Sequence, residues 1–234
     1  MKKDLEVTWW LNAKDTLVST AIQKYAPNGK SLLEVGCDDG RLLLKLNKKY
    51  ACTGIEPDKN AVNTAKKNKL NVFIGKAETF KLKEKFDVIL LLDVLEHTKD
   101  DSKSLQNSID HLKPGGIVII TVPALMALWS EHDKVLGHFR RYRRNQLSAL
   151  LAKNGLEIEF ISYWNFLLLP LTFLFQKLGS RNSAKHKRRS FSELVNKHFE
   201  KLLEIPLKIE NKLIKTGGKL PIGVSLVAVA RKKK

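Results

Sequence analysis

The sequence predicts an α/β fold built on a doubly wound, mostly parallel sheet, and three stretches carry that prediction. A short apolar run, Ser31 to Val35, is followed by a turn with glycines at 36 and 40 and then by leucines on one side of a helix. A second run ends at Glu56, and the run from Phe86 to Leu92 is the most apolar of the predicted core. Buried parallel strands have such continuous apolar runs. Ligands of this fold bind beyond the carboxyl ends of the strands.

Length and charge limit the functions to consider. The 234 residues, 43% of them hydrophobic, suffice for one domain with a sizeable core and an insertion. The net charge of +18 indicates an anionic partner: nucleic acid, a phospholipid surface or a phosphorylated substrate. Cys37 and Cys52 both fall in the predicted sheet region, which favours reduced buried thiols over a disulfide or a metal pair. We expect no signal peptide and no spanning helix, and hence a cytoplasmic protein.

The turn after the first strand indicates a nucleoside cofactor. The dinucleotide pattern G-x-G-x-x-G fails at two of its three glycines, because Asp38 and Arg41 occupy those positions. The pattern acid-x-G-x-G-x-G fits at Glu34, Gly36 and Gly40 and fails only at Asp38. Glu56 lies 20 residues after Gly36, a spacing that suits a carboxylate bound to ribose hydroxyls.

This pattern resembles motif I of the class I methyltransferases that use S-adenosylmethionine. The resemblance continues through G-I-E-P-D at Gly54 to Asp58, D-V-L-E-H at Asp93 to His97 and L-K-P-G-G at Leu112 to Gly116. It implies a Rossmann-like sheet of seven strands with the last one antiparallel, and S-adenosylhomocysteine as the product. The residues that the resemblance implies for cofactor binding are Glu34, Gly36, Cys37, Gly40, Glu56, Pro57, Ala77, Glu78, Asp93 and Val94.

Asp38 departs from the family pattern. Its charge would repel the methionine carboxylate of the cofactor, so we expect weakened affinity rather than a changed fold. A non-catalytic, cofactor-binding scaffold is therefore an alternative to an enzyme.

The D-V-L-E-H stretch allows three interpretations. In the first, its acids cap the turn and His97 packs structurally. In the second, His97 is a general base, because imidazole accepts protons near neutral pH. In the third, Asp93, Glu96 and His97 share one face of a helical turn and hold Mg²⁺ or a transition metal, as in the similar ubiquinone-pathway O-methyltransferases. The order given is our order of preference, so a divalent metal is not favoured.

The stretch from Trp129 to Arg144 is predicted to lie over the rim of the site. His132 and His138 are alternative bases there, and Arg140, Arg141 and Tyr142 are candidates for binding an anionic substrate, because guanidinium groups bind phosphate bidentately. The stretch resembles methyltransferases of lipid and surface-polysaccharide pathways. A solvated basic loop is the alternative.

The chain divides into an N-terminal helix or lid at 1–30, a cofactor-binding core at 31–165 and 223–234, and an insertion at 166–222. The N-terminal helix, Trp9 to Tyr25, either covers the cofactor or packs on the sheet edge. The insertion holds 12 Lys or Arg against 4 Glu and opens with an apolar stretch too short to span a bilayer. That combination favours a helix lying at a membrane surface, with a dimer contact or a lid as alternatives.

The leading functional prediction is O-methylation of a small or lipid-linked anionic acceptor, in the cytoplasm or at the inner face of a membrane. An RNA methyltransferase is supported by net charge alone. Against base methylation, the chain has no N/D-P-P-aromatic motif after the fourth strand and no cysteine placed as a nucleophile.

Overall fold

The computed structural model describes residues 8–179 and 197–233, and its centre is one seven-stranded sheet. The strands run in the order β3-β2-β1-β4-β5-β7-β6. Strand β7 is antiparallel to both neighbours, and the pairs from β3 to β5 are parallel. This confirms the predicted Rossmann-like sheet with an antiparallel last strand. The strands are β1 Ser31–Val35, β2 Ala51–Glu56, β3 Asn71–Ile74, β4 Phe86–Leu92, β5 Leu112–Pro123, β6 Leu156–Trp164 and β7 Ser225–Lys232.

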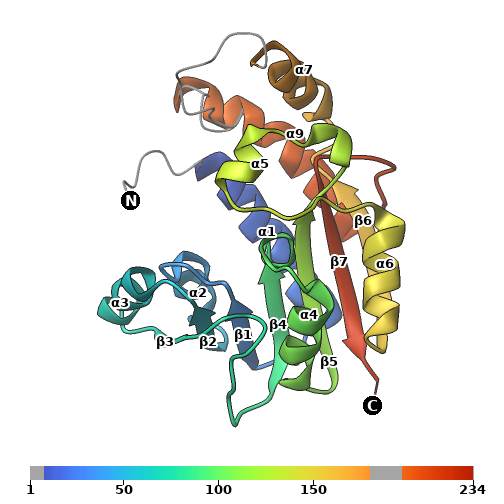
Figure 1. Cartoon of the computed structure of the whole chain (residues 1–234). Helices are drawn as coiled ribbons and strands as arrows, with labels where there is room; N and C mark the ends of the chain where they lie inside the picture. Colours follow the sequence, from blue (N-terminus) through green and yellow to red (C-terminus); the bar gives the residue numbers. More distant parts are fainter. Residues whose placement is uncertain (1–7, 180–196, 234) are drawn as a thin grey trace.

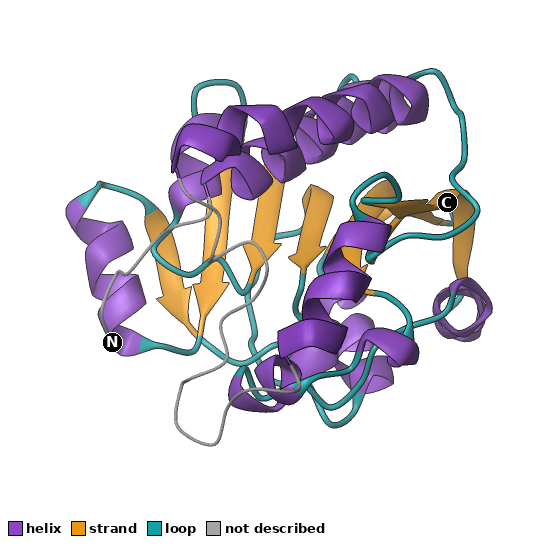
Figure 2. Ribbon diagram, turned by 90° about the horizontal axis from the view of Figure 1, so that it is seen from above, coloured by secondary structure: helices purple, strands orange, loops and turns teal. Residues whose placement is uncertain are grey.

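Helices cover both faces of the sheet (Figure 2). Short 3₁₀ turns, η1 Leu95–His97 and η2 Met126–Leu128, follow β4 and β5. The helices are α1 Thr8–Tyr25, α2 Arg41–Leu46, α3 Lys59–Lys67, α4 Asp101–Asp110, α5 Glu131–Val135, α6 Arg144–Lys153, α7 Leu169–Gly179 and α9 Lys197–Lys215.

The apolar runs of the sequence form the centre of the core. Strand β1 lies between β2 and β4, and residues Val88 to Leu91 of β4 are fully buried. The turns that follow these strands carry local capping signals. Asp58, two residues after β2, accepts hydrogen bonds from the amides of Asn60 and Ala61 and so starts α3. Because the strands from β3 to β5 are parallel, their carboxyl ends lie together at one end of the molecule, at the top of Figure 1.

Helix α1 packs against β5 and α9, in the interior of the fold. Its aromatic residues also contact the edge strand β6: the rings of Trp10 and Trp164 have centroids 4.5 Å apart, and those of Tyr25 and Phe160 lie 6.3 Å apart. Its inner side carries Leu17, Val18 and Ile22, which are almost fully buried. The interpretation of α1 as a lid over the cofactor stays a prediction.

The predicted insertion forms α7 and α9 between β6 and β7. Asn211 of α9 accepts a hydrogen bond from Trp164 Nε1 at 3.0 Å and donates one to the Ala13 carbonyl at 2.8 Å. These bonds join α9 to both β6 and α1. The basic run that includes Lys185 and Arg188 lies outside the described residues. Within the two described ranges, no helix combines the length and the apolar character needed to cross a bilayer.

Candidate active site

A cavity of about 480 Å³ opens at the carboxyl ends of β1, β2 and β4. This volume lies within the range of small-molecule sites. Seven of the ten residues predicted to bind the cofactor line it, and so does His97. The lining residues are Val35, Gly36, Glu56, Pro57, Gly75, Lys76, Ala77, Glu78, Asp93, Val94, His97 and Thr98.

The turn after β1 has a shape that side chains would disturb. Gly36 has φ +75°, and a Cβ built on it would lie 2.8 Å from Val94 Cγ2. Gly40 also has a positive φ, and it precedes the first residue of α2. Glu34, Cys37 and Gly40 do not line the cavity; Glu34 and Cys37 are buried behind the turn, and burial raises the pKa of the Cys37 thiol. These three residues therefore belong to β1 and the turn after it, but not to the wall of the cavity.

Glu56 is fixed at the end of β2 by two backbone amides. Its Oε2 accepts a hydrogen bond from the Asp38 amide and its Oε1 accepts one from the Asp58 amide, both at 2.9 Å. A carboxylate has about four acceptor positions, so two remain for the hydroxyls of a ribose. Asp38 itself has φ +49°, a conformation that Asp adopts more readily than most residues. Asp38 therefore keeps the turn's shape in place of a glycine, and its effect on cofactor affinity stays a prediction.

Lys14 of α1 reaches the end of β4. Its Nζ lies 2.8 Å from Asp93 Oδ2, and Thr121 Oγ1 donates to Asp93 Oδ1 at 3.0 Å. Burial alone would raise the pKa of Asp93, but the Lys14 ammonium outweighs it and holds that pKa below its usual value. Lys14 was not among the residues predicted from sequence, although it stands four residues before Val18, on the buried side of the helix.

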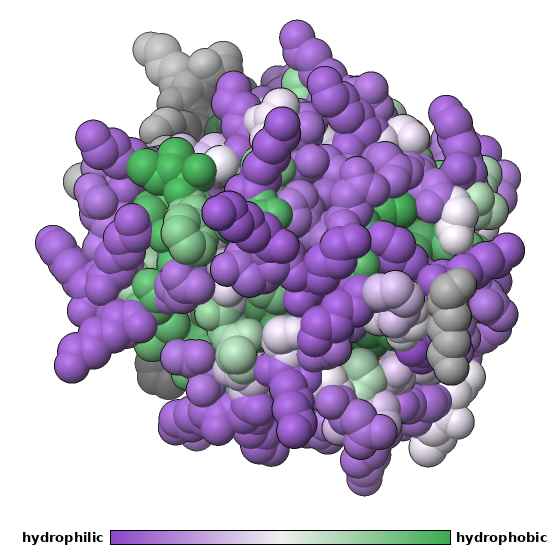
Figure 3. All heavy atoms as spheres, turned by 90° about the horizontal axis from the view of Figure 1, so that it is seen from below, coloured by the Kyte–Doolittle hydropathy of each residue, from purple (hydrophilic) through white to green (hydrophobic). Residues whose placement is uncertain are grey.

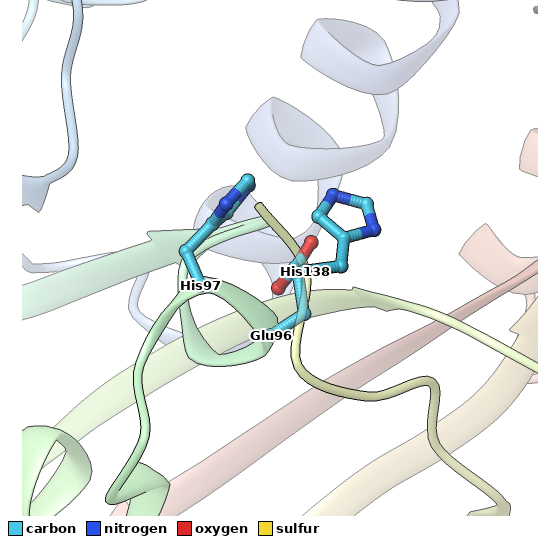
Figure 4. Close-up of side chains that lie close together, drawn as sticks. All are labelled: Glu96, His97 and His138. Carbon is cyan, nitrogen blue, oxygen red and sulfur yellow. The ribbon is translucent and has the colours of Figure 1, made fainter. Parts of the chain in front are cut away.

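Among the described residues, the group of possible metal ligands is Glu96, His97 and His138, whereas the third interpretation of the sequence named Asp93 with Glu96 and His97. Asp93 binds Lys14 and Thr121, whereas Glu96 and His97 of η1 lie beside His138 of the β5–α6 connection (Figure 4). One potential ligand atom from each of Glu96, His97 and His138 lies within 4.8 Å of the other two. The two imidazole rings have centroids 4.6 Å apart.

The surroundings of Glu96 and His97 favour the neutral form of each side chain. Glu96 is 1% exposed, and neither of its carboxylate oxygens has a hydrogen-bond partner. Burial, with the nearby charge of Asp93, raises the pKa of Glu96 well above its usual value. Burial and the neighbouring His138 lower the pKa of His97. A divalent ion fits the number and spacing of these donor atoms, and a metal role stays a prediction.

His138 is oriented by a buried carboxylate. Asp133 is fully buried, and its Oδ1 lies 3.0 Å from His138 Nδ1. Arg141 donates from Nε and Nη2 to both oxygens of the same carboxylate, at 2.7 and 3.0 Å. Burial would raise the pKa of Asp133, but the bonds from His138 and Arg141 hold it well below its usual range. The pair leaves Nε2 of His138 as the ring nitrogen that can take a proton.

The residues predicted to bind an anionic substrate bind protein groups in the structure. Arg140 Nη1 lies 2.9 Å from Asp101 Oδ2, and the hydroxyl of buried Tyr142 donates to the same oxygen at 2.8 Å. Arg141 binds Asp133, as described above. The third candidate base, His132, lies on α5 and is not part of the cluster with His97. Arg140 remains 31% exposed, and a substrate contact by it stays a prediction.

The pKa of one buried acid gives a test of stability. Burial raises the pKa of Glu34 to about 8, and Lys14 and Arg41 offset only part of this. The folded protein thus holds this proton more tightly than the unfolded chain does. The resulting stability is present below the usual pKa of glutamate and is lost as the pH rises through about 8.

We therefore expect the free energy of unfolding to fall between pH 5 and pH 8, and Glu34→Gln to remove much of that fall. Denaturant titrations at the two pH values measure both quantities. Glu131→Gln, at an exposed position of α5, is the matched control and should keep the pH dependence of the wild type. A Glu34→Gln protein with the wild-type pH dependence would contradict the assignment.

Comparisons with known proteins agree with this geometry. A family model described as a methyltransferase domain matches residues 11–160. The chain is 31% identical over 97 residues to a ubiquinone biosynthesis O-methyltransferase of Rickettsia canadensis, which covers 38% of the chain and 41% of that relative. A protein of the same name from Coxiella burnetii is 29% identical over 130 residues, 48% of the chain and 56% of the relative. The matched region thus spans about half the length of these curated relatives.

Solved structures share the fold along nearly the whole chain. A methyltransferase from Thermotoga maritima aligns with a TM-score of 0.59 and 19% identity, covering 97% of this chain and 93% of that one. The phosphoethanolamine N-methyltransferase 2 of Haemonchus contortus, solved with S-adenosylmethionine, gives 0.61 and 16% identity over 94% of this chain and 53% of that one. At these identities the likeness shows the fold alone.

Proposed function

The chain belongs to the methyltransferase-domain family, and from that premise we propose that it transfers the methyl group of S-adenosylmethionine to a hydroxyl of a small or lipid-linked anionic acceptor. The observation that carries this proposal is the arrangement at the carboxyl ends of β1, β2 and β4. There, one cavity is lined by the family's cofactor positions, and His138, which has a buried carboxylate partner, lies beside His97 of the cavity wall.

The residues present fit the cofactor. Glu56 has acceptor positions for the ribose, the Ala77–Glu78 side would take the adenine, and the turn at Gly36 would hold the methionine part. The Lys14 ammonium, paired with Asp93 on the cavity wall, would supply a positive charge near the methionine carboxylate. When bound, the cofactor supplies a methyl group already activated on a sulfonium, so the protein has to position the acceptor and remove one proton.

His138 is the group that we assign to proton removal. Its Nδ1 is paired with the Asp133 carboxylate, which fixes the tautomer and leaves Nε2 free to accept the hydroxyl proton. His97 lines the cavity next to it and stays neutral because its pKa is lowered. The arrangement supports a hydroxyl acceptor, since a hydroxyl loses its proton on methyl transfer and Nε2 of His138 would receive it.

Calorimetry with S-adenosylmethionine and S-adenosylhomocysteine tests the cofactor. We expect saturable binding of both, and no heat at millimolar donor would instead support the scaffold alternative raised by Asp38. Transfer of labelled methyl to a polar lipid extract or to total RNA, both from the cell that makes the protein, separates the two acceptor classes. Labelling of the RNA, with binding that weakens steeply with salt, would favour the RNA alternative.

We expect chelation to leave methyl transfer unchanged. Burial raises the pKa of Glu96 well above its usual value, which disfavours the ionised carboxylate that Mg²⁺ prefers as a ligand. Initial rates with and without EDTA test this directly. If EDTA lowers the rate and added Mg²⁺ or Mn²⁺ restores it, then Glu96, His97 and His138 hold a metal ion instead.

A further inference from the structure

We propose that the end of the molecule to which the parallel strands point docks on an anionic lipid bilayer, through apolar side chains of α7, α9 and the β5–α6 connection. The inference rests on the proposed function and deepens it, because the bilayer would then lie at the same end of the sheet as the cavity. It stands on separate observations: where the exposed apolar residues lie, how those of α9 are spaced, and which charges flank them.

Exposed apolar residues are concentrated at one end of the described chain. Twelve of its sixteen exposed large hydrophobic residues fall in three segments: four between Met126 and Phe139, four between Leu167 and Leu174, and four between Leu202 and Leu213. Helices α5, α7 and α9 of these segments lie at the top of Figure 1, the end to which the parallel strands point. The opposite end is mostly hydrophilic (Figure 3). A bilayer is a partner that fits a molecule with one apolar end.

Helix α9 presents two different faces. Leu207, Asn211 and Ile214 face inward and are buried, and Asn211 is tied to α1. Leu202, Ile205, Ile209 and Leu213 follow one another at intervals of three and four residues, so they form one outward stripe. These four side chains are between 44% and 60% exposed. Since the inner face is already used, packing within the described chain does not explain the stripe.

The charges beside the stripe identify the partner as anionic. Lys201, Lys208, Lys212 and Lys215 are exposed, and their spacing places them in one row next to the stripe. Lys208 also pairs with Glu204 at 3.1 Å, one turn away. Two copies of this chain that met through the stripe would bring two lysine rows together. An anionic lipid surface accepts both the aliphatic side chains and the row of ammonium groups.

The docking surface is joined to the cavity wall through helix α1. Helix α9 is bound to α1 through the bond between Asn211 and the Ala13 carbonyl. The next residue of α1, Lys14, pairs with Asp93 on the cavity wall. The surface that would meet the bilayer and the wall of the cavity are therefore parts of one continuous packing.

Vesicle flotation of the full-length protein tests the proposal. With vesicles of phosphatidylglycerol and phosphatidylcholine we expect most of the protein to float, and with pure phosphatidylcholine little. The double substitution Ile205→Ser and Ile209→Ser should lower the floated fraction at least tenfold. Phe73→Ser with Ile74→Ser is the matched control, because these residues are 44% and 58% exposed on the far edge strand β3. The control should float like the wild type.

Three results would overturn the proposal: no flotation of the wild type, equal loss in the control, or equal flotation of the α9 variant. Light scattering without lipid gives a fourth result that would overturn it. A wild-type dimer that the α9 substitutions convert to a monomer would show that a second copy covers the stripe. Calorimetry with S-adenosylmethionine on the same variants should be unchanged. A loss of flotation with intact cofactor binding thus concerns docking alone, whereas a failure of the proposed function would appear in calorimetry of the wild type.

Discussion

The substitution His138→Ala is expected to lower kcat for methyl transfer by about 10²–10⁴-fold, the usual contribution of a positioned general base. The reason is the bond between His138 Nδ1 and the buried Asp133 carboxylate, which leaves Nε2 to receive a proton beside the cavity. The dissociation constant of S-adenosylmethionine should not change, because His138 does not line the cavity. Single-turnover rates and calorimetry measure the two quantities separately.

His132→Ala is the matched control for this experiment. His132 belongs to the same segment, six residues earlier, but it is not part of the cluster with His97. It should keep the wild-type rate. Raising the pH should recover part of the His138→Ala rate, because hydroxide then removes the acceptor proton. A wild-type rate in His138→Ala, or an equal loss in His132→Ala, would move the base elsewhere, with His97 as the next candidate.

Asp133 is a positioning residue that acts through His138, and the substitution Asp133→Asn tests that role. Asparagine keeps the size of the side chain but loses the charge that binds both His138 and Arg141. If Asp133 acts through His138, the substitution lowers kcat, shifts the pH profile of kcat and leaves KM for the donor unchanged. A purely structural role would lower the thermal midpoint without moving the pH profile.

The central strands could be predicted from sequence because burial on both faces requires uninterrupted apolar runs. The runs Ser31 to Val35, Ala51 to Glu56 and Phe86 to Leu92 are the observed β1, β2 and β4. A local rule on glycine and proline would start strand β5 after Gly116, but the strand begins at Leu112. The reason is pairing: Phe86 of β4 is in register with Leu112, and a register shift follows before Val88. The glycine turn at 115 and 116 thus lies within the strand, which a local rule on glycine and proline does not foresee.

The cavity wall could be predicted for a related reason, since its residues follow strand ends that converge at one edge of the sheet. Lys14 and Asp133 could not be assigned their contacts, because these depend on how α1 and the β5–α6 connection fold back over the sheet. The arginine cluster shows most clearly that residue type alone does not predict the contacts of a charged side chain. Residue type suggested phosphate binding, yet Arg141 binds Asp133, eight residues earlier. Both partners lie in one short segment, and the sequence does not say which charges turn inward.

Gly36→Ala is expected to abolish measurable binding of S-adenosylmethionine. The new Cβ would lie 2.8 Å from Val94 Cγ2, closer than side-chain carbons approach, and the residue would have to keep φ +75°. The left-handed conformation alone costs an L-residue about 1–2 kcal/mol. Because both Gly36 and Val94 line the cavity, relief of the clash must displace part of its wall.

Gly155→Ala separates the conformational cost from the clash. Gly155 has φ +73°, nearly that of Gly36, but a Cβ there meets nothing within 4 Å, and the residue lies far along the chain between α6 and β6. Both variants should lose a similar amount of stability from backbone strain, and only Gly36→Ala should lose cofactor binding in calorimetry.

The double variant Gly36→Ala with Val94→Ala completes the comparison. Removing Val94 Cγ2 takes away the atom that the new Cβ would meet, so the two substitutions should not add, and part of the cofactor affinity should return. Additive losses would mean that the turn needs glycine for its backbone alone. Full binding by Gly36→Ala would contradict a cofactor site at this turn, and with it the assignment of the cavity between β1 and β4.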